Sequence, residues 1–181
     1  IAEMGRRLAS RVPDADERRD MLRTVHYEAV RAGLDPQLVL AVIHHESGFK
    51  KYAVSVADAR GYMQVMPFWT RLIGSGGHNL FHMRTNLRYG CVILRLYLDR
   101  EKGDLYRALG RYNGSLGRGE YPTAVLSAMQ RYASASAPAV ISCAMRSSKP
   151  IFTATCRGQR WAAATSARCS ASSPCPRTAN C

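Results

Sequence analysis

The sequence predicts a mainly α-helical protein, and three observations support this prediction. Apolar residues recur at helical spacing in residues 18–32 and 86–98. Helix-start signals stand at Asp35-Pro36 and at Asp104, and Gly33 supplies a stop. No segment alternates with period two for long enough to indicate a strand. A chain of 181 residues is long enough to form one such domain around a substantial core.

The first half of the chain is expected to contain two adjacent helices. Residues 1–17 are polar and arginine-rich, and we expect them to form a frayed lead-in. The first helix is expected over residues 18–32. The second runs from Asp35 to Glu46, is apolar on nearly every face and is broken by Ser47-Gly48, so it should be buried. Residues 49–60 are expected to be loop, with a short helix at 61–66.

The second half of the folded region is expected to alternate loops and helices. The glycine-rich stretch 70–82 predicts a flexible surface loop beside a cleft. The remaining helices are expected from Asn86 to Leu98, from Asp104 to Asn113 and from Pro122 to Tyr132. In the first of these helices, Cys91 is most simply a small buried hydrophobic residue. Together these elements give one folded domain over residues 18–133.

The composition changes sharply at residue 134, where Ala, Ser, Thr, Pro, Arg and Cys take over. Five of the six cysteines lie in residues 134–181. Too few apolar residues remain there to offset chain entropy, so we expect a disordered tail. A disulfide-bearing appendage in an oxidising compartment and an out-of-frame or non-native extension are the two alternatives.

The formal net charge of +13 favours an anionic partner without identifying it. Peptidoglycan with anionic polymers, nucleic acid and acidic lipid all fit, but no nucleic-acid-binding signature accompanies the arginines. No apolar run of about 18 residues predicts a transmembrane helix. No signal peptide is visible, although a chain that begins at Ile1 is compatible with a removed leader.

Glu46 is the strongest candidate for a catalytic residue. It stands at the C-terminal end of an apolar helix, where the helix dipole is negative, and both the dipole and burial disfavour ionisation. A carboxyl held protonated near neutral pH is what a general acid for glycosidic bond cleavage requires. The alternative is an ordinary solvated glutamate at a helix end.

Other catalytic patterns are weaker. The run His44-His45-Glu46 lacks the i, i+4 histidine pair of a zinc helix, and no serine occupies a Gly-x-Ser-x-Gly elbow. We therefore expect neither a metal nor another cofactor, and a single catalytic carboxylate.

Three ordered motifs resemble one enzyme family. Glu46-Ser47-Gly48-Phe49 is followed by Ser55, then by the segment from Gly61 to Pro67 that reads GYMQVMP, and later by Tyr112-Asn113-Gly114. This order resembles the soluble-type lytic transglycosylases, lysozyme-like enzymes that cleave bacterial peptidoglycan, over residues 22–132. The resemblance implies the α-helical lobe of a lysozyme-like fold in a periplasmic or otherwise exported protein.

The resemblance also implies a mechanism and a set of substrate-binding residues. Glu46 would protonate the glycosidic oxygen, the N-acetyl group of muramic acid would assist, and Glu46 would then deprotonate the 6-hydroxyl. The product would be a 1,6-anhydro sugar. Tyr112 would offer its hydroxyl to Glu46 or to the substrate. The implied substrate-binding residues are Ser55, Met63, Gln64, Met66, Tyr112 and Asn113.

Two departures from the family pattern keep alternatives open. Asp58 stands where the family more often has a small residue such as Gly, and a second carboxyl in the cleft would permit lysozyme-like hydrolysis. His82-Met83 replaces the family's Asp-Pro. The rival functions are a goose-type lysozyme-like hydrolase and a non-catalytic wall-binding or assembly module. We expect a monomer that binds glycan strands and not nucleic acid, with association with an envelope-spanning apparatus left open.

Overall fold

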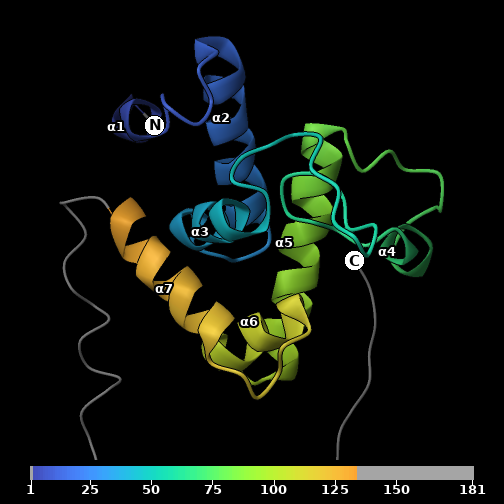
Figure 1. Cartoon of the computed structure of the whole chain (residues 1–181). Helices are drawn as coiled ribbons and strands as arrows, with labels where there is room; N and C mark the ends of the chain where they lie inside the picture. Colours follow the sequence, from blue (N-terminus) through green and yellow to red (C-terminus); the bar gives the residue numbers. More distant parts are fainter. Residues whose placement is uncertain (1, 134–181) are drawn as a thin grey trace, which may run out of the picture. The chain divides into compact units, whose positions relative to one another are not determined.

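The computed structural model describes residues 2–133, and these form a helical domain (Figure 1). The helices are α1 (Ala2–Arg7), α2 (Ala15–Arg31), α3 (Pro36–Glu46), α4 (Phe68–Leu72), α5 (Met83–Arg100), α6 (Leu105–Asn113) and α7 (Glu120–Tyr132). Extended pairing within this described region is limited to two isolated bridges, Val54 with Arg60 and Arg60 with Val65. The mainly α prediction is confirmed. The predictions for the tail concern residues 134–181, which lie outside the described residues.

Aspartates begin three of these helices because their side chains accept N–H groups that have no partner in the first turn. They are Asp14 before α2, Asp35 before α3 and Asp104 before α6. The last two are the expected start signals. Asp14 places the start of α2 three residues earlier than the periodicity predicted.

The prediction of a frayed lead-in over residues 1–17 is wrong. Residues 2–7 are helical, and Leu8 and Val12 belong to the hydrophobic core. These two side chains are spaced i, i+4, and they bury an apolar face too short to show as a periodic pattern. The Arg7 guanidinium also donates to the Arg131 carbonyl at 2.9 Å, which ties this segment to the end of α7.

Helix α3 lies at the centre of the domain, with α2, α5 and α7 around it in Figure 1. All six residues from Leu38 to Ile43 are buried, as the apolar run predicts. Helix α3 packs chiefly against α7 and α2, while α5 packs against α2 and α6. The core therefore fixes the direction of α3 and the position of its last residue, Glu46.

The segment between α3 and α5 differs from the prediction in two places. Residues 61–64 form turns and Val65 pairs with Arg60, and a short helix follows instead at Phe68–Leu72, so the glycine-rich loop begins after residue 72. Helix α5 starts at Met83 rather than at Asn86. The physical reason is that Asn86 is buried and uses its side chain for tertiary hydrogen bonds instead of capping a helix.

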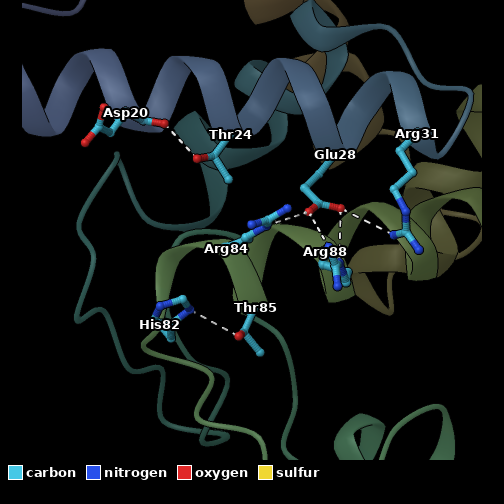
Figure 2. Close-up of polar contacts among 8 residues, drawn as sticks. All are labelled: Asp20, Thr24, Glu28, Arg31, His82, Arg84, Thr85 and Arg88. Atoms are coloured by element: carbon cyan, nitrogen blue, oxygen red, sulfur yellow. Dashed lines mark hydrogen bonds and ion pairs between the residues drawn. The ribbon is translucent and has the colours of Figure 1, made fainter.

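A buried carboxylate joins α2 to α5 (Figure 2). Glu28 is 1 % exposed, and Arg88 binds both of its oxygens at 3.0 and 3.3 Å. Arg31 and Arg84 stand at 3.4 and 3.6 Å from the same carboxylate. A charge this deeply buried is tolerated only with such partners. None of the described helices is long and apolar enough to cross a bilayer.

Candidate active site

Glu46 is the last residue of α3, and its carboxyl is partly buried. The helix stops there because Ser47 takes the C-cap position and its hydroxyl donates to the carbonyls of Ile43 and Tyr62, at 3.2 and 2.8 Å. Burial raises the pKa of Glu46 from 4.5 to about 7. At neutral pH the carboxyl is therefore protonated in a substantial fraction of the molecules and ionised in the rest.

Tyr121, in the first turn of α7, is the hydrogen-bond partner of this carboxyl. Its hydroxyl donates to Glu46 Oε1 at 2.5 Å, and this bond lowers the pKa of Glu46 against the larger effect of burial. Burial and the nearby carboxylate keep the pKa of Tyr121 far above its ordinary value, so it remains a neutral donor. Sequence reasoning missed Tyr121, since only the packing of α7 on α3 brings the two residues together.

The two histidines before Glu46 attach α3 to α7. His45 Nε2 contacts the Ala124 carbonyl at 3.0 Å, and its ring meets Tyr121 edge to face. His44 Nδ1 contacts the Tyr132 hydroxyl at 2.6 Å. Burial and nearby Arg11 lower the pKa of His44 to about 4, so it is neutral near pH 7. Both histidines therefore help to set the position of Tyr121 over Glu46.

The Tyr112 hydroxyl is bonded to Met63 and not to Glu46, which was the first of its two expected partners, the other being the substrate. Tyr112 donates to the Met63 carbonyl at 2.8 Å, while the Met63 N–H donates to Asn86 Oδ1 at 2.8 Å. The Met63 side chain is fully buried against Gly90, where a Cβ would lie 2.3 Å from the Met63 sulfur. The Met63 side chain is therefore not accessible to a substrate, and its backbone is held between Tyr112 and Asn86.

Asn86 is a second residue that sequence reasoning missed. Its Nδ2 donates to the carbonyls of Arg60 and Leu80, each at 2.8 Å, in addition to the bond with Met63. Gly61 has φ of 73°, and a Cβ there would lie 2.5 Å from Asn86 Nδ2. Asn86 therefore fixes the glycine turn of the GYMQVMP segment against α5. The only signal for this role in the sequence was a polar residue, asparagine, at a position that the helical pattern would bury.

Gln64 and Met66 are partly exposed, as a substrate-facing position requires. Gln64 has φ of 47°, and its amide donates to the carbonyls of Ala53 and Gly61 at 3.1 and 3.0 Å. Met66 packs against the edge of the core. Both side chains are consequently held in place by the turn.

Ser55 and Asn113 are exposed, and neither is bonded to Glu46. Ser55 Oγ accepts the Ala59 N–H at 3.1 Å and so closes the loop after α3. Asn113 is the last residue of α6, followed by Gly114 in the left-handed conformation. Their binding roles remain proposals, because the contacts of both residues are local.

Asp58, the second carboxyl that the sequence offers, is paired with Arg60 at the surface. Both of its oxygens accept hydrogen bonds from Arg60 at 3.0 Å, and its side chain is 56 % exposed. Its φ of 66° lies in the left-handed region, which glycine adopts without strain. This backbone conformation explains a preference for Gly at the position. The described residues contain no group of three or more His, Cys, Asp or Glu side chains placed to hold a metal ion.

His82 and Met83 occupy the N-cap and first position of α5, where the resemblance led us to expect Asp-Pro. His82 supplies no side-chain cap, and its Nδ1 contacts Thr85 Oγ1 at 3.2 Å (Figure 2). The backbone turns into a helix at Met83, three residues before the expected start at Asn86. The departure leaves the first turn of α5 without a side-chain cap.

A helical domain whose central buried helix ends in a partly buried glutamate is the arrangement that the lysozyme-like resemblance implied. Residues 23–130 match the Transglycosylase SLT domain, and the chain belongs to this family. It is 32 % identical over 112 residues to membrane-bound lytic murein transglycosylase C of Yersinia pestis strain Pestoides F, and equally to that of Yersinia pseudotuberculosis serotype O:1b. These matches cover 53 % of this chain and 31 % of each relative.

Among solved structures, the chain resembles an inactive mutant of lytic transglycosylase Slt from Pseudomonas aeruginosa. The two align with a TM-score of 0.55 and 24 % identity, over 61 % of this chain and 23 % of the other. This likeness shows the fold. The chain spans about a third of the length of the curated relatives, so it matches one part of larger proteins.

Proposed function

We propose that this domain is a peptidoglycan lytic transglycosylase that cleaves the β-1,4 bond between N-acetylmuramic acid and N-acetylglucosamine. The observation that carries the proposal is a single carboxyl, Glu46, whose pKa of about 7 suits both donating and accepting a proton. Membership of the Transglycosylase SLT domain family and the murein transglycosylase relatives support the substrate class.

The proposed reaction begins with protonated Glu46. It donates its proton to the glycosidic oxygen as the bond from that oxygen to the anomeric carbon breaks, and the N-acetyl group of the same sugar assists at that carbon. The resulting Glu46 carboxylate takes the proton of the 6-hydroxyl, whose oxygen bonds to the anomeric carbon. One proton leaves Glu46 and one returns, and the product carries a 1,6-anhydro ring without consuming water.

Tyr121 supports both steps because it remains a neutral donor throughout. Its hydrogen bond strengthens when Glu46 becomes a carboxylate, since bonds to an ionised acceptor are stronger than neutral ones. This favours the ionised intermediate state after the first proton transfer. Burial favours the protonated state before it. The opposing effects place the pKa of Glu46 between the two tasks.

Hydrolysis, the rival reaction, would require a second carboxylate or an activated water on the other face of the sugar. Asp58, the residue that the sequence offered for this, is bonded to Arg60 on the surface. This pairing favours the single-carboxyl route. The wall-binding alternative gains no support from Glu46, because a binding surface has no use for a carboxyl with a raised pKa.

Substrate contacts are assigned to side chains that the fold leaves accessible. We propose that Gln64, Met66 and Asn113 contact the glycan directly, with Ser55 at the edge of the site. Met63 and Tyr112 would support these substrate contacts indirectly, because their mutual hydrogen bond holds the GYMQVMP segment in place. We further propose that the domain acts as a monomer, without cofactor, in the periplasm or outside the cell, where peptidoglycan lies.

The proposal is tested with purified peptidoglycan and two proteins, the wild type and Glu46→Gln. Gln keeps the shape of the side chain and removes the transferable proton. We expect the wild type to release fragments whose muramic ends are lighter by one water than the hydrolysed sugar. The variant should lose at least about 10³-fold in turnover while its circular dichroism is unchanged. Reducing ends from the wild type would instead assign the hydrolase function.

A further inference from the structure

A small cavity lies beside the first turn of α5, and its lining shares no residue with the candidate active site. Its volume is about 130 Å³. Each lining side chain can donate a hydrogen bond in at least one of its ordinary protonation states, and none is acidic. The lining consists of His78, His82, Arg84, Thr85, Arg88 and Tyr89. Such a lining suits an anion.

The arginines of this lining carry more positive charge than their buried partner can neutralise. Arg84 and Arg88, together with Arg31, surround the single carboxylate of Glu28, as Figure 2 shows. A guanidinium has five N–H donors, and Arg88 gives only two of them to Glu28. The side chains of Arg84 and Arg88 remain 60 % and 44 % exposed. Donors and net positive charge are therefore available to a ligand.

Two other lining residues, His78 and Tyr89, are held in place by hydrogen bonds. His78 Nδ1 contacts the Tyr89 hydroxyl at 2.7 Å, and its Nε2 contacts Ser75 Oγ at 3.3 Å. The loop comes this close to α5 because residue 74 is glycine, whose added Cβ would lie 1.7 Å from the Tyr89 hydroxyl oxygen. The glycine-rich loop thus has a defined position over the cavity.

The start of α5 adds backbone donors. His82 caps this 18-residue helix without a side-chain hydrogen bond to the first turn. The unpaired first-turn N–H groups and the helix dipole both favour an anion at this end. They lie in the same turn as Arg84 and Thr85, so the backbone donors and side-chain donors serve one site.

We propose that this cavity binds a phosphate group, either as inorganic phosphate or as the phosphate ester of a small polyol. Its volume corresponds to roughly four water molecules, enough for one tetrahedral oxyanion. The N–H groups of Arg84 and Arg88 that Glu28 does not use, together with the first-turn N–H groups of α5, suit the several oxygens of phosphate. A planar carboxylate would leave part of these N–H groups without a partner.

Binding is tested on the full chain by two-dimensional amide NMR, with inorganic phosphate, glycerol 3-phosphate and acetate as separate probes at constant ionic strength. We expect saturable shifts confined to residues 75–89 with either phosphate probe, and binding at least about fivefold weaker with acetate. Tighter binding of glycerol 3-phosphate than of inorganic phosphate would identify an ester as the ligand. The reverse order would identify the free ion.

Three variants separate the site from general charge. Arg84→Gln removes the arginine that is farthest from Glu28, and it should weaken phosphate binding about tenfold. His78→Gln changes another lining residue, leaves the partners of Glu28 in place and should weaken binding several-fold, so it serves even if Arg84→Gln fails to fold. Arg100→Gln, at the far end of the same helix, is the matched control and should bind as the wild type does. Absence of saturable shifts, or equal affinity in all three variants, overturns the proposal.

Discussion

Replacing Tyr121 by Phe isolates the hydrogen bond that opposes the effect of burial on Glu46. The change removes one hydroxyl, which donates to Glu46 Oε1 at 2.5 Å, and keeps the ring that packs on His45. A hydrogen bond to an ionised group contributes about 1.5–3 kcal/mol, and one pKa unit corresponds to about 1.4 kcal/mol. Loss of the bond should therefore raise the pKa of Glu46 from about 7 to between about 8 and 9.

The assay is the pH dependence of kcat/KM on peptidoglycan. Because the free enzyme must hold Glu46 protonated to begin the reaction, kcat/KM of the wild type should fall as pH rises through about 7. In Tyr121→Phe this fall should move upward by about one to two pH units. The maximal kcat should also decrease, by about tenfold, because the carboxylate formed after the first step loses its donor.

The control is Tyr106→Phe, which removes another tyrosine hydroxyl, one that donates only to the Gly119 carbonyl at 3.3 Å. Its pH profile should match that of the wild type. An unchanged high-pH limb in Tyr121→Phe, measured beside this control, would refute the view that Tyr121 sets the pKa of Glu46.

Three further substitutions test, in turn, the burial of Glu46, the role of Asp58 and the N-terminus of α5. Glu46→Gln should raise the free energy of unfolding by up to about 3 kcal/mol at pH 8 and by little at pH 4. The reason is that a pKa raised in the folded state lowers stability only where the carboxyl of the unfolded chain is ionised. A variant whose denaturation midpoint differs from that of the wild type equally at both pH values would contradict this. Asp58→Asn should leave kcat within about twofold, since Asp58 bonds only Arg60, and a loss of about 10²-fold would restore the two-carboxyl mechanism. His82→Asp should raise the free energy of unfolding by about 1 kcal/mol in urea titrations, because Asp supplies the missing side-chain N-cap of α5. A lower midpoint would show that the His82 contact with Thr85 stabilises the fold more than an N-cap does.

The features that could be predicted from the sequence are local ones. Asp35-Pro36 starts α3 and the apolar run after it buries the helix, so the position of Glu46 at a helix end follows from a dozen neighbouring residues. The motif order predicted that Gln64 and Met66 line the substrate site, and both side chains are partly exposed, although the short helix expected at residues 61–66 is absent. Each of these inferences needs only the chain near the residue in question.

The features that could not be predicted depend on packing between distant segments. Tyr121 reaches Glu46 across 75 positions, and Asn86 reaches Met63 across 23. Tyr112 was expected to orient Glu46 or the substrate, but its hydroxyl donates to the Met63 carbonyl, and Tyr121 is the tyrosine bonded to Glu46. The sequence does not specify which of the two tyrosines reaches the carboxyl. Leu8 was assigned to a frayed segment, although it belongs to the core, because one apolar turn gives no periodic signal.

The fold gives Glu46 the surroundings that its proposed catalytic role requires. A buried apolar helix must end where its last side chain can leave the core, and Glu46 stands at that boundary, partly shielded from water. Desolvation raises its pKa, while Tyr121 limits the rise. The site thus obtains an acid and a base from one residue, without a metal or a second carboxyl in the proposed route.

In the proposed reaction the Glu46 carboxylate regains a proton from the 6-hydroxyl, and no water enters the product. The most direct test digests peptidoglycan in water enriched in the heavy isotope of oxygen and measures the mass of the new muramic ends. We expect anhydro ends that contain no heavy oxygen. Muramic ends that carry one heavy oxygen from solvent would contradict it and would show that the enzyme hydrolyses the bond.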